Sequence, residues 1–105
     1  MKYPVCESKA YFSGEESFNI HRAEVSQVCL HTHDFIEIAY IENGSGIHIL
    51  GNQKQQTRQG DLFIMNANIV HGFLTSGGKN KLGVINCIFQ AEFLDEALAD
   101  CGDDF

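Results

Sequence analysis

The H-x-H pair of His31 and His33, followed by Glu37 and Gly44, constrains the fold of this chain more than any other feature. Three residues separate His33 from Glu37, and six separate Glu37 from Gly44. Side chains alternate between the two faces of a β-strand, so residues two or four positions apart point to one side. An extended run would hold both histidines and Glu37 on one face, with His71 supplied by another strand. The spacing predicts an antiparallel β-structure that gathers these four residues.

The side chains of His31, His33, Glu37 and His71 form a donor set suited to a divalent metal ion. Neutral imidazoles and a carboxylate bind such ions at ~2.0–2.2 Å. Zn, Ni, Fe and Mn all accept this donor set with further positions left open. The same residues would also suit a polar ligand pocket without metal, or histidines held only by hydrogen bonds. We therefore expect either a metal site or an ordered polar site.

Short apolar runs separated by turn residues predict about eight strands. Ten glycines and one proline fit a chain rich in turns. From residue 91 the apolar positions change to a helical spacing. We expect one domain over residues 1–105, an all-β jelly-roll barrel with one short C-terminal helix. The expected strands cover residues 18–21, 25–30, 35–41, 46–50, 54–58, 62–65, 70–74 and 82–89, and the expected helix covers residues 91–99.

The run 35–41 is apolar on both faces, which is typical of a strand covered from two sides. Asn43-Gly44 follows this run and predicts a hairpin turn into the next strand. The expected helix 91–99 also carries an apolar stripe. Because a chain of 105 residues has little material to cover all of these surfaces, we expect a homodimer.

Seven further residues are candidates for lining a ligand pocket inside the barrel. Aromatic rings and amides together suit a small polar molecule such as a sugar. Core packing is the alternative for the aromatic residues and the methionine, and a role in tight turns is the alternative for the asparagines. Cys29, at the same strand parity as His31, is expected to be a small buried residue. The seven candidates are Phe35, Tyr40, His48, Phe63, Met65, Asn66 and Asn68.

The charge balance argues against a nucleic-acid-binding surface on this chain. The 14 acidic and 7 basic residues give a net charge of −7, and the basic residues are scattered. Nucleic-acid binding needs clustered positive charge that neutralises phosphates. The start, MKYPVCESKAYF, has no apolar signal segment, and no apolar run approaches the ~20 residues of a membrane span. Four cysteines without a C-x-x-C pair suit a reduced protein, so we expect a cytoplasmic location and no membrane partner.

The stretches HTHDFIEIAYIENGSGIHIL and RQGDLFIMNANIVHGF resemble the cupin superfamily. Within it, the H-D-F-I-E-I and G-D-L-F-I-M runs are similar to the N-terminal effector-binding domain of AraC-type transcription regulators. Val25 stands where cupins commonly have a glycine, and Asn66 and Asn68 stand where the second cupin motif has proline and glycine. The resemblance implies a jelly-roll sensor that binds a small-molecule effector, often a sugar.

In AraC-type regulators, helices after the barrel contribute to the dimer, and a helix-turn-helix domain then contacts DNA. No basic domain of that kind lies within residues 1–105, so we expect DNA to be contacted only through a further C-terminal domain. The alternative is a stand-alone metal-dependent cupin enzyme, of the isomerase or dioxygenase type. Four complete ligands favour the enzyme, whereas the altered second motif and the lack of a further carboxylate or lysine placed as a base disfavour it.

Overall fold

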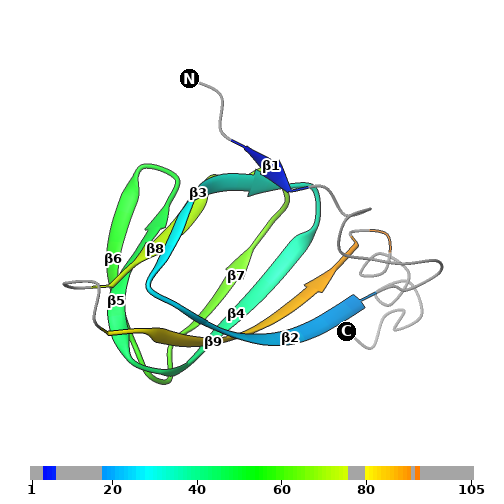
Figure 1. The fold of residues 1–105 in the computed structure, drawn as a ribbon. Coiled ribbons are helices and arrows are strands. Elements are labelled where there is room, and N and C mark those ends of the chain that lie inside the picture. Colours follow the sequence, from blue (N-terminus) through cyan, green and yellow to red (C-terminus); the bar gives the residue numbers. More distant parts are fainter. Residues whose placement is uncertain (1–3, 7–17, 76–79, 91, 93–105) are drawn as a thin grey trace, which may run out of the picture.

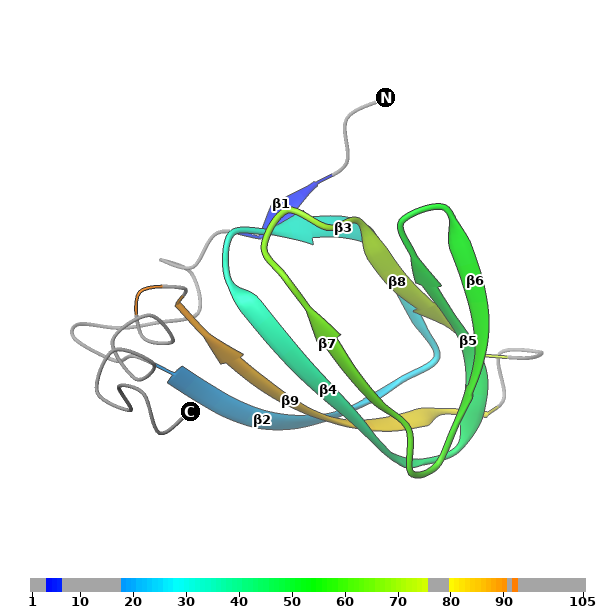
Figure 2. The same cartoon turned by 180° about the vertical axis from the view of Figure 1, so that it is seen from behind.

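Two facing β-sheets make up the structure, a computed structural model that describes residues 4–6, 18–75, 80–90 and 92 (Figure 1). One sheet has five strands in the order β1-β3-β8-β5-β6, and the other has four in the order β2-β9-β4-β7. The turned view shows the same two layers from behind (Figure 2). The strands are β1 Val5–Cys6, β2 Phe18–Val25, β3 Gln27–His33, β4 Ile36–Asn43, β5 Ser45–Leu50, β6 Gln53–Arg58, β7 Leu62–Met65, β8 His71–Leu74 and β9 Leu82–Phe89.

All eight expected strands have a counterpart, and the expected all-β class is confirmed. Strand β2 is longer than expected, because it pairs with β9 over its whole length from Phe18 to Val25. The short strand β1 was not expected, and it pairs in parallel with the end of β3. Apart from residue 92, the expected helix 91–99 lies outside the described residues.

The hairpin expected at Asn43-Gly44 is wrong, although the chain does turn there. Strand β4 pairs with β7 and β9, whereas β5 pairs with β6 and β8 in the other sheet. Gly44 has a positive φ of 91°, and a Cβ placed on it would lie 2.4 Å from the carbonyl oxygen of Lys81. Only glycine suits this backbone, which carries the chain from one sheet to the other.

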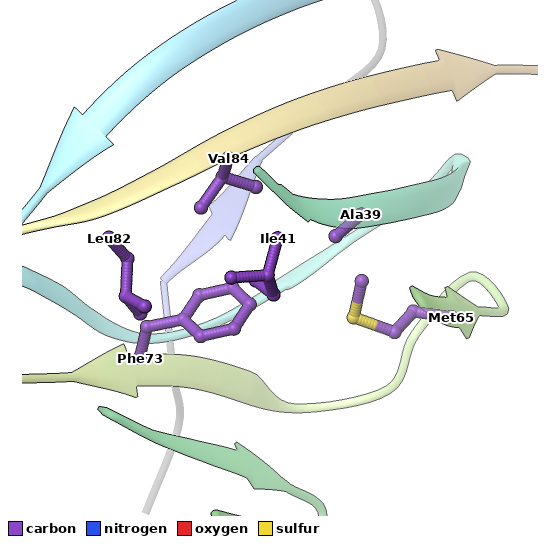
Figure 3. Packing of buried hydrophobic residues seen from close by; sticks show 6 residues of the cluster. All are labelled: Ala39, Ile41, Met65, Phe73, Leu82 and Val84. Atoms are coloured by element: carbon purple, nitrogen blue, oxygen red, sulfur yellow. The ribbon is translucent and has the colours of Figure 1, made fainter. Parts of the chain in front are cut away.

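Inward-facing side chains of both sheets fill the space between them. Strands β4 and β9 supply alternate residues, because successive side chains of a strand point to opposite faces. Phe73 of β8 meets them from the five-stranded sheet (Figure 3). The buried cluster consists of Ala39, Ile41, Met65, Phe73, Leu82 and Val84.

The expected cover on both faces of residues 35–41 is complete on the inner face, whereas on the outer face Ile36 is buried and Tyr40 is exposed. Phe35, Ala39 and Ile41 are buried, but Tyr40 on the outer face remains 39 % exposed. The strand register aligns Tyr40 with apolar residues of the neighbouring strands, and several of these are also exposed. We call this the outer sheet face, and it comprises Phe18, Ile20, Ile36, Ile38, Tyr40, Leu62, Ile64, Ile85, Cys87 and Phe89.

Candidate metal and ligand site

Three strands from the two sheets bring together the four residues singled out by the sequence. His31 and His33 lie at the end of β3, Glu37 lies at the start of β4, and His71 begins β8. The chain bends between β3 and β4, so the residues follow two strands instead of one. A β-bulge between Val28 and His31 shifts the register of β3 against β8 and aligns His31 with His71. We call His31, His33, Glu37 and His71 the four-residue cluster.

The histidine rings of the cluster converge on one another. One nitrogen from each of His31, His33 and His71 lies within 4.8 Å of the other two. The Nε2 atoms of His33 and His71 are 3.2 Å apart. Glu37 Oε1 lies 3.4 Å from Nε2 of His33 and 3.7 Å from Nε2 of His71. Three imidazoles and one carboxylate therefore present their donor atoms to one small region.

Backbone carbonyls orient two of these rings. His31 donates from Nδ1 to the carbonyl oxygen of Cys29 at 2.8 Å, and His33 donates from Nδ1 to that of Phe35 at 2.7 Å. A carbonyl only accepts hydrogen bonds, so the geometry assigns the proton of each neutral ring to Nδ1. Nε2 then carries the lone pair, which is the form that binds a metal. The donor chemistry of the cluster therefore fits a divalent ion.

Burial sets the protonation of the cluster. Burial raises the pKa of Glu37 to about 7, because the charged carboxylate loses its hydration. Burial, together with the neighbouring histidines, lowers the pKa of His71 to about 3. Burial also lowers the pKa of His33. Burial thus favours the neutral, metal-binding form of His33 and His71, and a bound cation would favour the ionised form of Glu37.

A cavity of about 110 Å³ adjoins the cluster. Its walls include His31, Glu37 and His71, together with apolar side chains from both sheets. At ~30 Å³ per water molecule, it holds about four groups of that size. Typical pockets for larger ligands measure ~300–1,000 Å³, so this cavity suits an ion and a few small polar groups.

The family of AraC-like ligand-binding domains matches residues 20–105, which include every strand from β3 to β9. The chain belongs to this family. It is 34 % identical over 64 residues to the HTH-type transcriptional activator RhaR of Escherichia coli strain K12. The match covers 61 % of this chain but 22 % of that activator, and the RhaR of Shigella flexneri matches equally. The chain thus spans about a fifth of the length of these curated relatives.

Solved structures of two cupin proteins and of a polyketide cyclase share the fold of this AraC-like domain. A cupin protein from Bacteroides fragilis superimposes with a TM-score of 0.65 at 16 % identity, covering 72 % of this chain and 68 % of that one. A cupin 2 conserved barrel protein from Rhodopseudomonas palustris gives 0.65 at 23 % identity, covering 76 % and 57 %. The polyketide cyclase RemF of Streptomyces resistomycificus gives 0.64 at 21 % identity, covering 72 % and 56 %. The expected cupin barrel is therefore confirmed.

The structure separates the seven candidate pocket residues of this AraC-like domain into two groups. Phe35, His48 and Met65 are buried inside the barrel, and Phe63 packs against the core. The interior position expected for Tyr40 is wrong, because it shares the parity of the outward-facing Ile38.

The two asparagines do not line the interior either. Asn66 and Asn68 are exposed in the turn between β7 and β8. Asn68 has a positive φ of 69° and donates its backbone N–H to the carbonyl oxygen of His33 at 2.7 Å. Asparagine tolerates this backbone conformation better than most residues, so Asn68 has the turn role that was the alternative for it.

Several cavity residues carry no chemical motif that would reveal them in the sequence. Cys6 and His21 come from β1 and β2, and Val28, Phe73 and Ile88 come from β3, β8 and β9. Phe73 and Ile88 could be recognised as interior residues from strand alternation. The place of Cys6 beside the cluster depends on the parallel pairing of β1 with β3.

A larger groove of about 760 Å³ lies away from the cluster, at the other ends of β5 and β8. Its walls include Gly46, Thr57 and Leu74, and Thr57 donates a hydrogen bond to Asp61 at 3.3 Å. None of the sequence candidates lines it, and it is open to solvent. Because its lining lacks the histidines and Glu37, we assign the chemistry to the smaller cavity. No helix in the described ranges is long and apolar enough to cross a membrane.

Proposed function

We propose that this chain is the effector-sensing domain of an AraC-type regulator and that it holds a divalent metal ion on its four-residue cluster. The observation that carries the proposal is the convergence of three imidazoles, of which His33 and His71 are buried and His31 is half-buried. In His31 and His33, Nδ1 is hydrogen-bonded to a backbone carbonyl oxygen. Glu37 would supply an oxygen ligand and one negative charge. Zn, Ni, Fe and Mn are the candidate ions, since each accepts this mixed donor set.

The effector would be a small polar molecule that binds beside the cluster. The cavity of about 110 Å³ has Phe35 and Phe73 among its walls, with Glu37 and His71 as polar groups. Aromatic faces beside a few hydrogen-bonding groups suit a hydroxylated compound, and a sugar remains the effector class we propose. A sugar of five or six carbons has more groups than the cavity holds, so only part of the molecule would lie inside it. Binding would favour one arrangement of the barrel over another.

Metal content is the direct test of the cluster. Protein purified without a histidine tag should contain close to one equivalent of metal, and His33→Ala should lose it. Lys54→Ala is the matched control, because Lys54 is exposed on the edge strand β6 and does not line the cavity beside the cluster. Equal metal content in all three proteins, or no metal uptake by the wild type from added Zn or Ni, would remove the metal from the proposal.

Effector binding can be screened by thermal shift with sugars, sugar acids and fatty acids, each with and without added metal. A true effector at about a hundredfold excess over its dissociation constant should stabilise the fold by ~2.7 kcal/mol. Glu37→Gln should weaken this stabilisation. Stabilisation by fatty acids alone, unchanged in Glu37→Gln, would show that the effector is not polar.

The partners of the domain follow from the same proposal. DNA would be contacted by a further domain of the regulator, because this chain carries a net charge of −7. The domain would work in the cytoplasm, where a transcription regulator meets DNA. A second copy of the chain would cover the outer sheet face, giving the homodimer.

The outer sheet face supplies the argument for that dimer. Ile20 and Ile64 are 61 % and 65 % exposed, and they lie in one row of the register with Ile38 and Cys87. The charged Arg22 at its border is paired with Glu42 at 2.7 Å. Monomers rarely expose large contiguous apolar patches, and a two-fold dimer places such a face against its own copy.

A metal-dependent cupin enzyme is the second candidate function, favoured by the complete set of four donors. Glu37, with its pKa near 7, would then serve as an acid or base beside the ion. A ligand recovered unchanged after prolonged incubation with metal-loaded protein supports the sensor. Conversion of that ligand by the wild type but not by His33→Ala supports the enzyme.

A further inference from the structure

His71 differs from the other two histidines of the cluster in the surroundings of its second nitrogen. His31 and His33 each have Nδ1 bonded to a carbonyl oxygen. Nδ1 of His71 is buried and has no hydrogen-bond partner among the described residues. The two nitrogens of an imidazole point in diverging directions, so Nδ1 of His71 faces away from the atoms that meet at the cluster. A group behind His71 must therefore satisfy this nitrogen.

His48 is the buried polar side chain behind His71. Strands β5 and β8 are neighbours, and their register pairs His48 with Phe73 and Leu50 with His71. His48 and His71 therefore lie diagonally on one face, with 5.7 Å between ring centroids and 82° between ring planes. His48 is fully buried, and neither of its ring nitrogens has a partner within the described ranges.

The surroundings of His48 are otherwise those of an apolar core residue. Its ring stacks on Phe73 at 4.4 Å and packs against Phe63 at 4.3 Å. Leaving a buried donor or acceptor unpaired costs ~1–3 kcal/mol. If the ring nitrogens of His48 made no hydrogen bond, replacing His48 with phenylalanine would therefore stabilise the folded protein. Burial lowers the pKa of His48 to about 4, so at neutral pH the ring is uncharged and offers one donor and one acceptor.

We propose that His48 is a positioning residue whose ring forms a hydrogen-bonded link, through one bridging water, to Nδ1 of His71. It would do for His71 what the carbonyls of Cys29 and Phe35 do for His31 and His33. A bridging water is needed for this link, since the two rings make no direct hydrogen bond. The consequence for metal binding rests on the proposed function, whereas the link itself does not.

A histidine suits this task better than a carbonyl because it can both donate and accept. Without metal, Nε2 of His33 carries a lone pair, so Nε2 of His71 donates to it across 3.2 Å. Nδ1 of His71 then accepts a hydrogen bond from the water that links it to His48. With metal, Nε2 of His71 must give up its proton, and Nδ1 becomes the donor. A neutral His48 can serve as the partner in both states.

The link is tested first in metal-free protein by the ¹⁵N resonances of the histidine rings. His48→Phe should shift the Nδ1 resonance of His71 while leaving those of His31 and His33 in place. His48→Gln, which keeps a donor and an acceptor, should largely restore the His71 shift. An Nδ1 resonance of His71 that is identical in wild type and His48→Phe would overturn the proposal, whether or not the protein binds metal.

Metal affinity is the second readout, measured by competition for Zn²⁺ with a chelating dye. His48→Phe should bind Zn²⁺ about 10–100-fold more weakly, the usual loss when the partner of a ligand histidine is removed. His48→Gln should recover most of that loss. Asn86→Leu is the matched control, since it removes another buried atom without a partner, Oδ1 of Asn86 on β9.

The outcomes separate this inference from the proposed function. Unchanged Zn²⁺ affinity in His48→Phe, in a wild type that binds one equivalent, refutes the role of His48 in positioning the ligand. Equal losses in His48→Phe and Asn86→Leu would refute it too, because a general effect on the core would explain both. A wild type that binds no metal refutes the proposed metal site, and the ring resonances then still decide on the link.

Discussion

Glu37 and His71 show that burial shifts the pKa values of an acid and a base in opposite directions within one site. Burial raises the pKa of Glu37 to about 7 and, with help from neighbouring histidines, lowers that of His71 to about 3. Each shift favours the neutral form of its group, because a charge in the interior loses hydration. Near pH 7 His71 is therefore neutral and Glu37 is only partly ionised, so a bound cation would favour the ionised form of Glu37.

Replacing Glu37 should make the metal-free protein more stable at alkaline pH. The folded pKa of Glu37 lies above the value of 4.5 for a free carboxyl, so its favourable contribution is complete below pH 4.5 and is lost as pH rises through 7. At ~1.4 kcal/mol per pKa unit, Glu37→Gln should unfold with a free energy up to ~3 kcal/mol higher at pH 8. The two proteins should be alike at pH 4.

Urea unfolding in a chelator, at several pH values, measures this difference directly. Glu24→Gln on the exposed part of β2 is the matched control and should not show the same gain at pH 8. The difference should reverse when metal is added, because Glu37 then acts as a ligand. Parallel stability curves for wild type and Glu37→Gln from pH 4 to pH 8 would contradict the buried, neutral state of this carboxyl.

At the scale of elements, the bulge in β3 decides which of its side chains enter the barrel. Val28 aligns with Phe73 and His31 aligns with His71, so one residue more than a regular strand allows lies between them. Cys29 is consequently exposed, and the buried position expected from its parity with His31 is wrong. Its carbonyl oxygen instead accepts the hydrogen bond that orients His31.

Gly72 is the residue of β8 that leaves room for this bulge. A Cβ at Gly72 would lie 2.5 Å from the carbonyl oxygen of Val28 and 3.3 Å from the backbone of Cys29 and Leu30. Gly72→Ala must push β3 away from β8, which should cost ~1–3 kcal/mol as overpacking does. It should also displace His31 from His71 and lower metal content well below one equivalent.

Gly51→Ala is the matched control for Gly72→Ala. Gly51 has a positive φ of 61°, but no atom lies within 4 Å of a Cβ placed there. The backbone strain alone should cost ~1–2 kcal/mol and leave the metal content unchanged. Chemical unfolding and metal analysis of the two variants separate strain in a turn from disruption of the bulge. Full metal content in Gly72→Ala would show that the bulge does not position the cluster.

At the scale of the whole molecule, the two sheets differ in their outward surfaces. The four-stranded sheet presents the apolar outer sheet face, whereas the edge strand β6 of the other sheet presents Lys54, Gln56 and Arg58. A net charge of −7 opposes self-association in general. The apolar face is where association would gain most from removing surface from water.

Sedimentation at high micromolar concentration should show a dimer that Ile64→Lys dissociates. Ile64 is 65 % exposed within the outer sheet face, so a buried lysine charge there would be costly in the dimer and harmless in the monomer. Ile47→Lys is the matched control, since Ile47 is an exposed isoleucine on the outer side of the other sheet. A monomeric wild type, or dissociation by both variants alike, would contradict this interface.

Local patterns in the sequence were sufficient for the β class, most strands and the membership of the four-residue cluster. Strand alternation depends only on neighbouring residues, so His33 and Glu37 could be placed inside before any pairing was known. The short polar gap between the expected strands 46–50 and 54–58 likewise contains the turn at Gly51, which joins β5 and β6 as a two-residue hairpin.

Strand pairing and local irregularities were decided only by the tertiary structure. Whether Gly44 closes a hairpin or carries the chain between sheets depends on contacts with Lys81, far along the chain. The exposure of Cys29 depends on a bulge that fits against Gly72, and the place of His48 behind His71 depends on the register of β5 with β8. The alternation of apolar and polar residues predicts which side of a strand a residue faces. Which residues it contacts on that side depends on strand register and on packing across the whole barrel.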